Sequence, residues 1–294
     1  MNTDYRLGAD LGGTKIEAAL LAPSGELVSR TRVPTPGGDY TGTLDAIRDL
    51  VLGIESEHGL DPLPLGIGVP GSLSPATGLM RNANSICLNN QALHKDLEEH
   101  LQRPVKMAND ANCLALSEAV DGAAADAEIV FGVILGTGVG GGVVVRGQLV
   151  EGHNAVAGEW GHMPLPWPND EERPGESCYC GRQGCIETYL GGPAVEVEAR
   201  RRGIGLAMAT DMEQDAPELL ERWLDQLARS LAVVIDLIDP NVIVIGGGLN
   251  RVEAIYREIP HRLPQWVFSD VVSTAIVPAK HGDSSGVRGA ARLW

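Results

Sequence analysis

The chain has 294 residues, of which 44% are hydrophobic and 21% charged, a composition typical of a globular protein of roughly two domains. It carries 23 Lys and Arg against 39 Asp and Glu, and the net charge of −16 argues against a nucleic-acid partner, because a polyanion is repelled by such a surface. No apolar run approaches the roughly 18 residues of a membrane span, and the N-terminus lacks the basic and apolar regions of a secretory signal. We therefore expect a cytoplasmic protein with no membrane partner.

The predicted elements begin with short strands joined by glycine turns. Residues 5–30 alternate apolar segments with a glycine turn at 12–13 and a second turn at 23–25, which predicts three strands. Apolar residues at helical spacing then predict a helix within residues 39–60, and residues 65–69 form a short apolar strand. Residues 107–110 resemble a strand end, and a helix is predicted over residues 111–120.

The second half of the chain continues this alternation. Residues 129–135 are a continuous apolar strand, residues 217–238 a long amphipathic helix, and residues 242–245 another strand. Asp239 and Pro240 stop the helix, and a glycine cluster follows the last strand. The alternation of strands and helices predicts an α/β protein.

One internal similarity links the two halves. The segment 11–14 (Leu-Gly-Gly-Thr) is followed by small apolar residues, a glycine and the sequence Glu-Leu-Val at 26–28. The segment 135–138 (Leu-Gly-Thr-Gly) is followed by glycines, a valine run, a glycine and Gln-Leu-Val at 148–150. Two copies of one glycine hairpin indicate two similar halves, whereas the alternative is chance, since short Gly/Val hairpins are common.

The two glycine turns are candidate phosphate-binding loops. A glycine turn directly after a strand lets backbone N–H groups approach phosphate oxygens without a Cβ in the way. Thr14 and Lys15 add a hydroxyl and a cation to the first turn, and Asp10 at the strand end is suited to a hydrated Mg²⁺. The candidate residues are Asp10, Gly12, Gly13, Thr14, Lys15, Gly136, Thr137, Gly138 and Gly140. The alternative is a structural hairpin at each turn, because no P-loop is present. A Rossmann fingerprint is excluded as well, since the valines at 143–145 after the second glycine run predict a strand and not a helix.

Two further strand ends carry candidate residues. Gly246, Gly247 and Gly248 follow a buried strand at a position suited to nucleotide contact, and the alternative is a plain strand-to-helix turn. Asn109 and Asp110 stand where a strand meets a helix, so two rigid elements position them. Taken alone, this pair is ordinary helix capping, and only a substrate site nearby favours a catalytic role.

The sharpest local signal is a predicted zinc site. Cys178, Cys180 and Cys185 place three thiols in one short loop, with glycines at 181 and 184 that permit its tight turns. Three ligands are one short of a tetrahedral zinc site, and His162 is the natural fourth. In a chain without a secretory signal, this pattern predicts a metal cluster in a reducing compartment.

Several alternatives to this ligand set remain open. His153 and His281 are other candidate fourth ligands, and the three loop cysteines could instead form a disulfide or be unrelated free thiols. Cys87 and Cys113 are best explained as small core residues.

Three polar residues surround the predicted metal loop. Glu159 and His162 lie upstream of the cysteines and Glu187 lies just downstream. Hydroxyl-rich substrates need several acceptors, and a Glu on each side of a rigid loop would supply them. The alternative is an ordinary solvated loop.

Taken together, these motifs resemble the ROK family of bacterial sugar kinases. The motifs run in family order and span residues from about 8 to about 290; they are Asp10–Lys15, Asn109–Asn112, Gly136–Gly142, Glu159–His162, the cysteine loop 178–187 and Gly246–Gly248. Residues 70–75, 82–84, 161–167 and 280–286 are more similar to the fructokinase (mannose/fructose kinase) branch.

The resemblance implies a fold and a domain division. The expected fold is the actin-like ATPase fold, with two ribonuclease-H-like lobes and a central cleft. Residues 1–119 with 283–294 form the expected smaller lobe, which holds the first phosphate loop and the catalytic Asp. Residues 120–282 form the expected larger lobe, which holds the second phosphate loop, the zinc loop and the nucleoside-side glycines.

The resemblance also implies roles for individual residues. Both glycine turns would bind ATP phosphates and residues 246–248 the nucleoside, with Mg²⁺ as cofactor. Asp110 would be the catalytic base, and the sugar hydroxyls would be held by Asn84, Asn109, Asp110, Glu159, His162 and Glu187. A structural Zn²⁺ would be bound by His162, Cys178, Cys180 and Cys185. His162 would ligate zinc through one ring nitrogen and donate to a sugar hydroxyl through the other.

The expected activity is ATP-dependent phosphorylation of a hexose by a homodimeric enzyme. D-Fructose, giving fructose 6-phosphate, is the first expectation, and a glucokinase, a mannokinase or an N-acetylhexosamine kinase of the same family is the alternative. An alternative of another class is a non-catalytic sugar-sensing regulator. The family includes repressors with an added N-terminal DNA-binding segment, and we expect this chain not to be one of them, because the first strand is predicted to begin by about residue 5.

Overall fold

The computed structural model describes residues 4–83 and 85–294. The chain divides into two compact units, each an α/β structure. The first unit comprises Met1–Ser117, Glu151–Val156 and Ser284–Trp294, and the second comprises Glu118–Val150 and Ala157–Asp283.

The first unit is built on a five-stranded sheet of order β3-β2-β1-β4-β7. Strand β2 is antiparallel to β1 and β3, whereas β4 pairs in parallel with both β1 and β7. A separate small hairpin joins β5 and β6. The strands are β1 (Arg6–Leu11), β2 (Lys15–Leu21), β3 (Leu27–Pro34), β4 (Leu65–Val69), β5 (Ser72–Leu73), β6 (Met80–Arg81) and β7 (Val105–Asn109).

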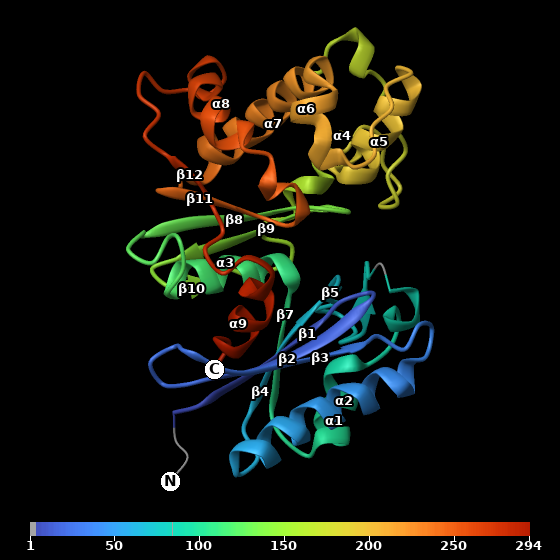
Figure 1. The fold of residues 1–294 in the computed structure, drawn as a ribbon, viewed down its shortest axis with the longest axis vertical. Coiled ribbons are helices and arrows are strands. Elements are labelled where there is room, and N and C mark those ends of the chain that lie inside the picture. Colours follow the sequence, from blue (N-terminus) through green and yellow to red (C-terminus); the bar gives the residue numbers. More distant parts are fainter. Residues whose placement is uncertain (1–3, 84) are drawn as a thin grey trace. The chain divides into compact units, whose positions relative to one another are not determined.

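Helices cover both faces of this sheet (Figure 1). Helix α1 (Tyr40–His58) and helix α2 (Leu93–Leu101) pack on one face, and their apolar side chains form a core with alternate residues of β1 and β4. Helix α1 begins at the predicted place, where the Asp39 side chain accepts a hydrogen bond from the Gly42 N–H, and it ends at Gly59 in the left-handed conformation. Helix α3 (Asp110–Val120) directly follows β7.

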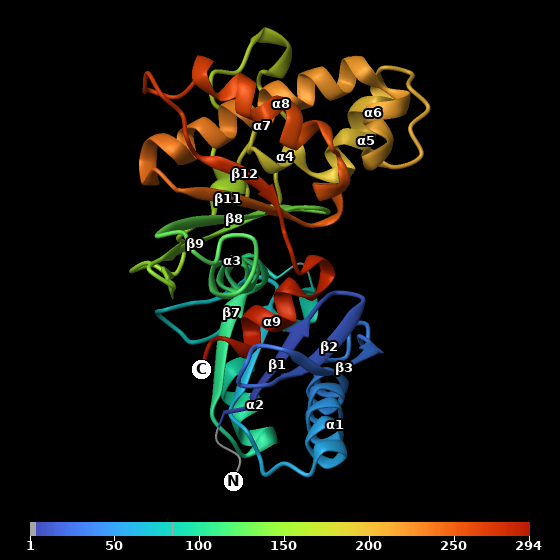
Figure 2. The same ribbon diagram turned by 60° about the vertical axis from the view of Figure 1, so that its left-hand side comes forward.

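Helix α9 (Ser285–Ala291) lies on the opposite face of the sheet, as both views show (Figures 1 and 2). It approaches the strands so closely that a Cβ on Gly8 would lie 2.4 Å from the Val287 carbonyl oxygen, and one on Gly66 would lie 1.8 Å from that of Ala290. Glycine at these two positions therefore permits the contact, and the C-terminal segment becomes part of the first unit.

The second unit has a sheet of the same plan, of order β10-β9-β8-β11-β12. Strand β9 is antiparallel to β8 and β10, and β11 is parallel to β8 and β12. Because order and directions match those of the first sheet, the topology supports the duplication inferred from the two glycine hairpins. The strands are β8 (Ile129–Leu135), β9 (Val139–Val145), β10 (Gln148–Leu149), β11 (Val242–Gly246) and β12 (Ala275–Pro278).

Helices of the second unit gather over one face of its sheet, with α7 and α8 on the same side of the strands in both views (Figures 1 and 2). Apolar residues of α7 and α8 form one core with those of β8 and β11. The α-helices are α4 (Glu187–Leu190), α5 (Gly192–Arg201), α6 (Met212–Asp215), α7 (Pro217–Ile238) and α8 (Ala254–Arg262). Within the described residues, no helix combines the length and apolarity required to span a bilayer.

The second glycine turn is shorter than the sequence pattern predicts. Strand β9 begins at Val139 and not near residue 143, so the glycines at 140–142 are paired strand residues. A Cβ on Gly141 would lie 2.6 Å from the Phe131 ring and 2.8 Å from the Trp160 ring. Glycine in this strand thus makes room for Trp160, whose indole donates a 2.9 Å hydrogen bond to the Gly140 carbonyl.

A buried ion pair fixes the segment that precedes the cysteine loop. Arg229 of α7 donates to Glu172 at 2.7 Å and also to the carbonyl oxygens of Pro166 and Trp167. Burial opposes the ionised form of Glu172, but hydrogen bonds from Arg229 and Gln226 outweigh it and lower the pKa of this carboxyl group. The two opposite charges thereby pair with each other inside the unit.

Candidate active site

Two carboxylates meet at the carboxyl edge of the first sheet. Asp10 lies near the end of β1, and Asp110 is the first residue of α3, directly after β7. Since β1, β4 and β7 are parallel, their carboxyl ends share one edge, which is where ligands bind in open α/β sheets. The charge of Asp110 raises the pKa of Asp10, so the two groups are close in space.

The capping role at this junction belongs to Asn109. Its side-chain oxygen accepts a 2.8 Å hydrogen bond from the Asn112 N–H, as an N-cap does. Asp110 stands one residue later, in the first turn, and its Oδ1 accepts from the Ala111 N–H at 2.8 Å. The sequence alone left capping and chemistry as alternatives for this pair, and the structure gives the cap to Asn109.

Asp10 is partly buried, and its surroundings disfavour the ionised form of its carboxyl group. Burial raises its pKa from 3.8 to about 7, and the charges of Asp110 and Glu17 contribute to this shift. Glu17 lies directly opposite Asp10 across the β1–β2 pair and is itself held by Arg30 and Arg32. A cation beside Asp10 would be stabilised by these negative charges. Carboxylate oxygens such as those of Asp10 and Asp110 are ligands that fit the Mg²⁺ expected from the sequence.

We expect Asp10→Asn to stabilise the protein at pH 8 in magnesium-free buffer. Because the pKa of Asp10 is higher in the folded state, the native protein binds more protons than the unfolded chain between pH 3.8 and about 7. The free energy of unfolding of the wild type therefore falls across this range as pH rises. At pH 8 the free energy of unfolding of Asp10→Asn should exceed that of the wild type by roughly 2–4 kcal/mol, and at pH 5 this difference should be about 2 kcal/mol smaller. Thermal unfolding at the two pH values measures this difference. Asp126→Asn, at an exposed position, is the control, and an equal change at both pH values would refute the shift.

The first glycine turn is a tight hairpin closed by its own backbone. The Gly12 N–H donates to the Lys15 carbonyl at 2.9 Å, and Thr35 donates to Gly12 and Thr14 carbonyls from its hydroxyl and backbone N–H. Gly13 lies at the tip, and Lys15 begins β2. The turn keeps the predicted residues together at the end of β1.

The second glycine turn lies beside the third glycine cluster. The Gly136 carbonyl accepts from the Gly192 N–H at 2.7 Å, and a Cβ on Gly136 would lie 3.7 Å from the Gly248 nitrogen. Gly247 has φ +83°, and a Cβ there would lie 2.3 Å from the Leu135 carbonyl oxygen. The candidate nucleotide-binding residues of the second unit are therefore adjacent in space at the ends of β8 and β11.

The start of β9 connects this turn to the predicted substrate residues. Glu187 accepts a 2.9 Å hydrogen bond from the Val139 N–H through Oε2, and its Oε1 lies 4.0 Å from the Cys178 sulfur. The short helix at Trp160–His162 packs against Val139 as well, since a Cβ on Gly161 would lie 2.0 Å from the Val139 carbonyl oxygen. One carboxylate thus bridges the second glycine turn and the cysteine loop.

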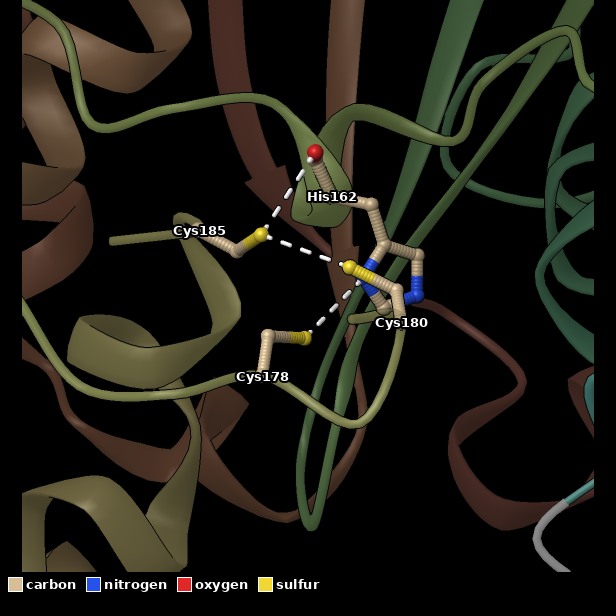
Figure 3. A group of neighbouring side chains, drawn as sticks. All are labelled: His162, Cys178, Cys180 and Cys185. Atoms are coloured by element: carbon tan, nitrogen blue, oxygen red, sulfur yellow. Dashed lines mark hydrogen bonds between the residues drawn. The ribbon is translucent and has the colours of Figure 1, made fainter. Parts of the chain in front are cut away.

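The predicted zinc ligands converge on one point (Figure 3). The three thiol sulfurs and one ring nitrogen of His162 all lie within 4.8 Å of one another. The Cys178 sulfur is 3.5 Å from His162 Nδ1, and the Cys180 and Cys185 sulfurs are 3.6 Å apart. All three are free cysteines, so no disulfide joins them.

These distances fit a tetrahedral zinc ion. Zn–S bonds of about 2.3 Å and a Zn–N bond of about 2.0 Å at tetrahedral angles place sulfurs about 3.8 Å apart and a sulfur and nitrogen about 3.5 Å apart. Burial raises the pKa of the Cys185 thiol to about 12, so a metal ion is needed to stabilise its thiolate at neutral pH. Three cysteines and a histidine would fill all four positions, which is typical of a structural site.

Tyr179 is a residue of this site that the sequence analysis did not single out. It stands between two ligand cysteines, its side chain is 71% exposed, and its hydroxyl is 2.9 Å from His162 Nε2. Burial of the hydroxyl end and the nearby charges of Glu187 and Glu159 raise the pKa of Tyr179. The nitrogen expected to face a sugar hydroxyl therefore has Tyr179 as its partner. An aromatic residue inside a predicted metal-binding loop was the available signal.

The predicted site residues fall into two groups. The first unit holds Asp10, the first glycine turn, Asn109 and Asp110. The second unit holds the second glycine turn, residues 246–248, Glu159, Glu187 and the predicted zinc ligands. Asn84, the remaining expected sugar-binding residue, lies outside the described residues.

Comparison with known proteins identifies the family. The ROK family profile matches residues 6–294, nearly the whole chain. The chain belongs to the ROK family. It is 41% identical over 297 aligned positions to the N-acetyl-D-glucosamine kinases of Vibrio atlanticus and Vibrio cholerae, and in both cases the match covers 97% of this chain and 98% of the relative.

Solved ROK structures share the fold. The ROK hexokinase of Thermus thermophilus aligns with a TM-score of 0.80 and 31% identity, over 98% of this chain and 96% of that one. The ROK glucokinase of Streptomyces griseus, solved with glucose and AMPPNP, aligns with a TM-score of 0.80 and 28% identity over 98% of each chain. The expected actin-like ATPase fold of the ROK family is thereby confirmed. The expected fructokinase branch gains no support from these relatives, whereas the N-acetylhexosamine alternative does.

Proposed function

We propose that the protein is an ATP-dependent sugar kinase that transfers the γ-phosphoryl group to a hydroxyl of N-acetyl-D-glucosamine. The observation that carries this proposal is the 39–41% identity, over 97% of the chain, to relatives named N-acetyl-D-glucosamine kinase. These relatives favour the N-acetylhexosamine alternative over fructose. The sugar-kinase class rests in addition on the ROK hexokinase and glucokinase that share the fold.

Asp110 is the proposed catalytic base. Its position after β7, in the first turn of α3, is set by two regular elements, and Asn109 supplies the helix cap without it. Phosphoryl transfer has a loose transition state, so an ordinary carboxylate suffices to accept the proton of the attacking hydroxyl late in the step. The carboxylate also orients that hydroxyl towards the phosphorus atom.

Each unit contributes one proposed phosphate-binding turn. The residues are Gly12, Gly13, Thr14 and Lys15 in the first unit and Gly136, Thr137, Gly138 and Gly140 in the second, with Gly246, Gly247 and Gly248 near the nucleoside. Backbone N–H groups at such turns favour phosphate oxygens. Bound Mg²⁺ would neutralise phosphate charge, and Asp10 is the residue suited to hold it.

The sugar is proposed to bind through Asn84, Asn109, Asp110, Glu159, His162 and Glu187. The structural zinc, on Cys178, Cys180, Cys185 and His162, would hold the Glu159–His162 turn and Glu187 in one fixed relation. The 2.9 Å bond from Val139 to Glu187 and the 3.5 Å approach of Cys178 to His162 support this role. Because the four ligands close the site, the zinc would not activate a water molecule.

An acceptor panel tests the proposed substrate. We expect the kcat/KM for N-acetyl-D-glucosamine to exceed those for glucose, mannose and fructose by at least about 10-fold, since one hydrogen bond to a buried polar group accounts for a factor of this size. Coupled ADP production with each sugar measures it, with a sugar-free reaction as control. A higher kcat/KM for fructose or glucose would overturn the assignment. If none of the sugars raises ADP production above the sugar-free reaction, the result would favour the non-catalytic regulator.

A further inference from the structure

We infer that Tyr179 is a further sugar-positioning residue, which presents its hydroxyl to the substrate next to His162. The inference rests on the proposed function, because it assigns a contact within the proposed sugar site. The cysteine loop carries this tyrosine between two ligands, Cys178 and Cys180, so its backbone is fixed on both sides.

The direction of the hydrogen bond follows from the ligand geometry. His162 Nδ1 is the nitrogen that faces the thiol cluster, 3.5 Å from the Cys178 sulfur (Figure 3). A histidine that binds a metal through Nδ1 carries its hydrogen on Nε2. Nε2 therefore donates to the Tyr179 hydroxyl oxygen at 2.9 Å. The phenol accepts this bond, and its own O–H remains a donor for another group.

The surroundings of the phenol indicate a sugar as that group. The carboxylates of Glu187 and Glu159 lie near Tyr179, and both are proposed to hold sugar hydroxyls. A sugar hydroxyl both donates and accepts, so it can donate to a carboxylate and accept from the phenol at once. The ring of Tyr179 meets the imidazole edge to face, with centroids 5.0 Å apart and an interplanar angle of 88°, which fixes the orientation of the phenol.

The exposure of Tyr179 agrees with a ligand contact. The side chain is 71% exposed although it is an aromatic residue on the cysteine loop, between two of the predicted zinc ligands. A purely structural tyrosine would gain more by packing into the core, as the fully buried Trp223 does. The exposed ring would be covered when the apolar face of a sugar lies against it, a use typical of rigid aromatic side chains.

The test compares sugar affinity in Tyr179→Phe, Tyr179→Ala and wild type by calorimetry without ATP, together with steady-state kinetics and zinc content. We expect Tyr179→Phe to raise the Kd and KM for N-acetyl-D-glucosamine about 10-fold, with kcat changed less than about 3-fold and with the KM for ATP and the zinc content unchanged. Tyr179→Ala should weaken sugar binding further, because the ring is lost as well. Tyr40→Phe, which removes a hydroxyl bonded to Asp96 in the first unit, is the matched control and should leave sugar affinity unchanged.

The outcomes separate this inference from the proposed function. A sugar Kd within about 2-fold of wild type in Tyr179→Phe, or a loss of zinc that accounts for the weaker binding, overturns the role of Tyr179 while the wild-type enzyme still phosphorylates the sugar. If the wild type binds the sugar without phosphorylating it, the proposed function fails, and the ratio of Kd values still decides the role of Tyr179.

Discussion

Asp110→Ala is expected to lower kcat by at least roughly 10²-fold while sugar binding persists. General base catalysis typically contributes a factor of 10² to 10⁴. The fold should survive, because Asn109 caps α3 through its bond to Asn112. The lost interaction of the Asp110 carboxylate with the helix dipole costs about 0.5–1 kcal/mol. Steady-state kinetics with the sugar Kd measured separately test this expectation.

The Asp126→Ala variant is the control for this experiment, because Asp126 is exposed and lies away from both glycine turns in sequence. Its kcat should equal that of wild type. Turnover near the wild-type value in purified Asp110→Ala would remove Asp110 from the mechanism.

Cys180→Ser is expected to lower the zinc content and raise the KM for the sugar by at least about 10-fold. Loss of one ligand leaves three, and the loop would no longer hold His162, Tyr179 and Glu187 in the relation that the structure shows. Structural zinc contributes about 10–16 kcal/mol in small peptides, but the second unit has its own apolar core, so the loss should stay local. ATP affinity and helix content should therefore persist.

The zinc experiment has a matched control in Cys87→Ser. Cys87 is a free cysteine of the first unit, so this variant changes a thiol without touching the cluster. Elemental analysis should find about one zinc per chain in wild type and in the control. A fully active wild-type protein without zinc would contradict the structural role.

The regular elements were predictable because hydrophobic patterning determines them. The long helix at Pro217–Ile238 and the strand at Val242–Gly246 follow directly from apolar periodicity and from the stop at Asp239 and Pro240. The start of β9 was predicted too late, because glycines were taken as loop residues. Their place in the strand depends on Phe131 and Trp160, whose rings lie where a Cβ on Gly141 would be.

The candidate site was predictable wherever its chemistry is local in sequence. The cysteine loop and His162 were identified from spacing and residue type, and the structure brings them together. The bond from Val139 to Glu187 and the bond from His162 to Tyr179 were not predicted, because each joins residues that only the folded chain makes neighbours. The substrate was predicted least well, since sugars with similar hydroxyl groups differ in contacts that short motifs do not encode.

We propose that the protein transfers a phosphoryl group from ATP to N-acetyl-D-glucosamine. Mass spectrometry of the products after incubation with ATP, Mg²⁺ and this sugar tests it directly. We expect a sugar monophosphate formed in equal amount to ADP, and neither product in comparable amount when the sugar is omitted. Equal ADP formation with and without the sugar, with no sugar phosphate detected, would contradict it.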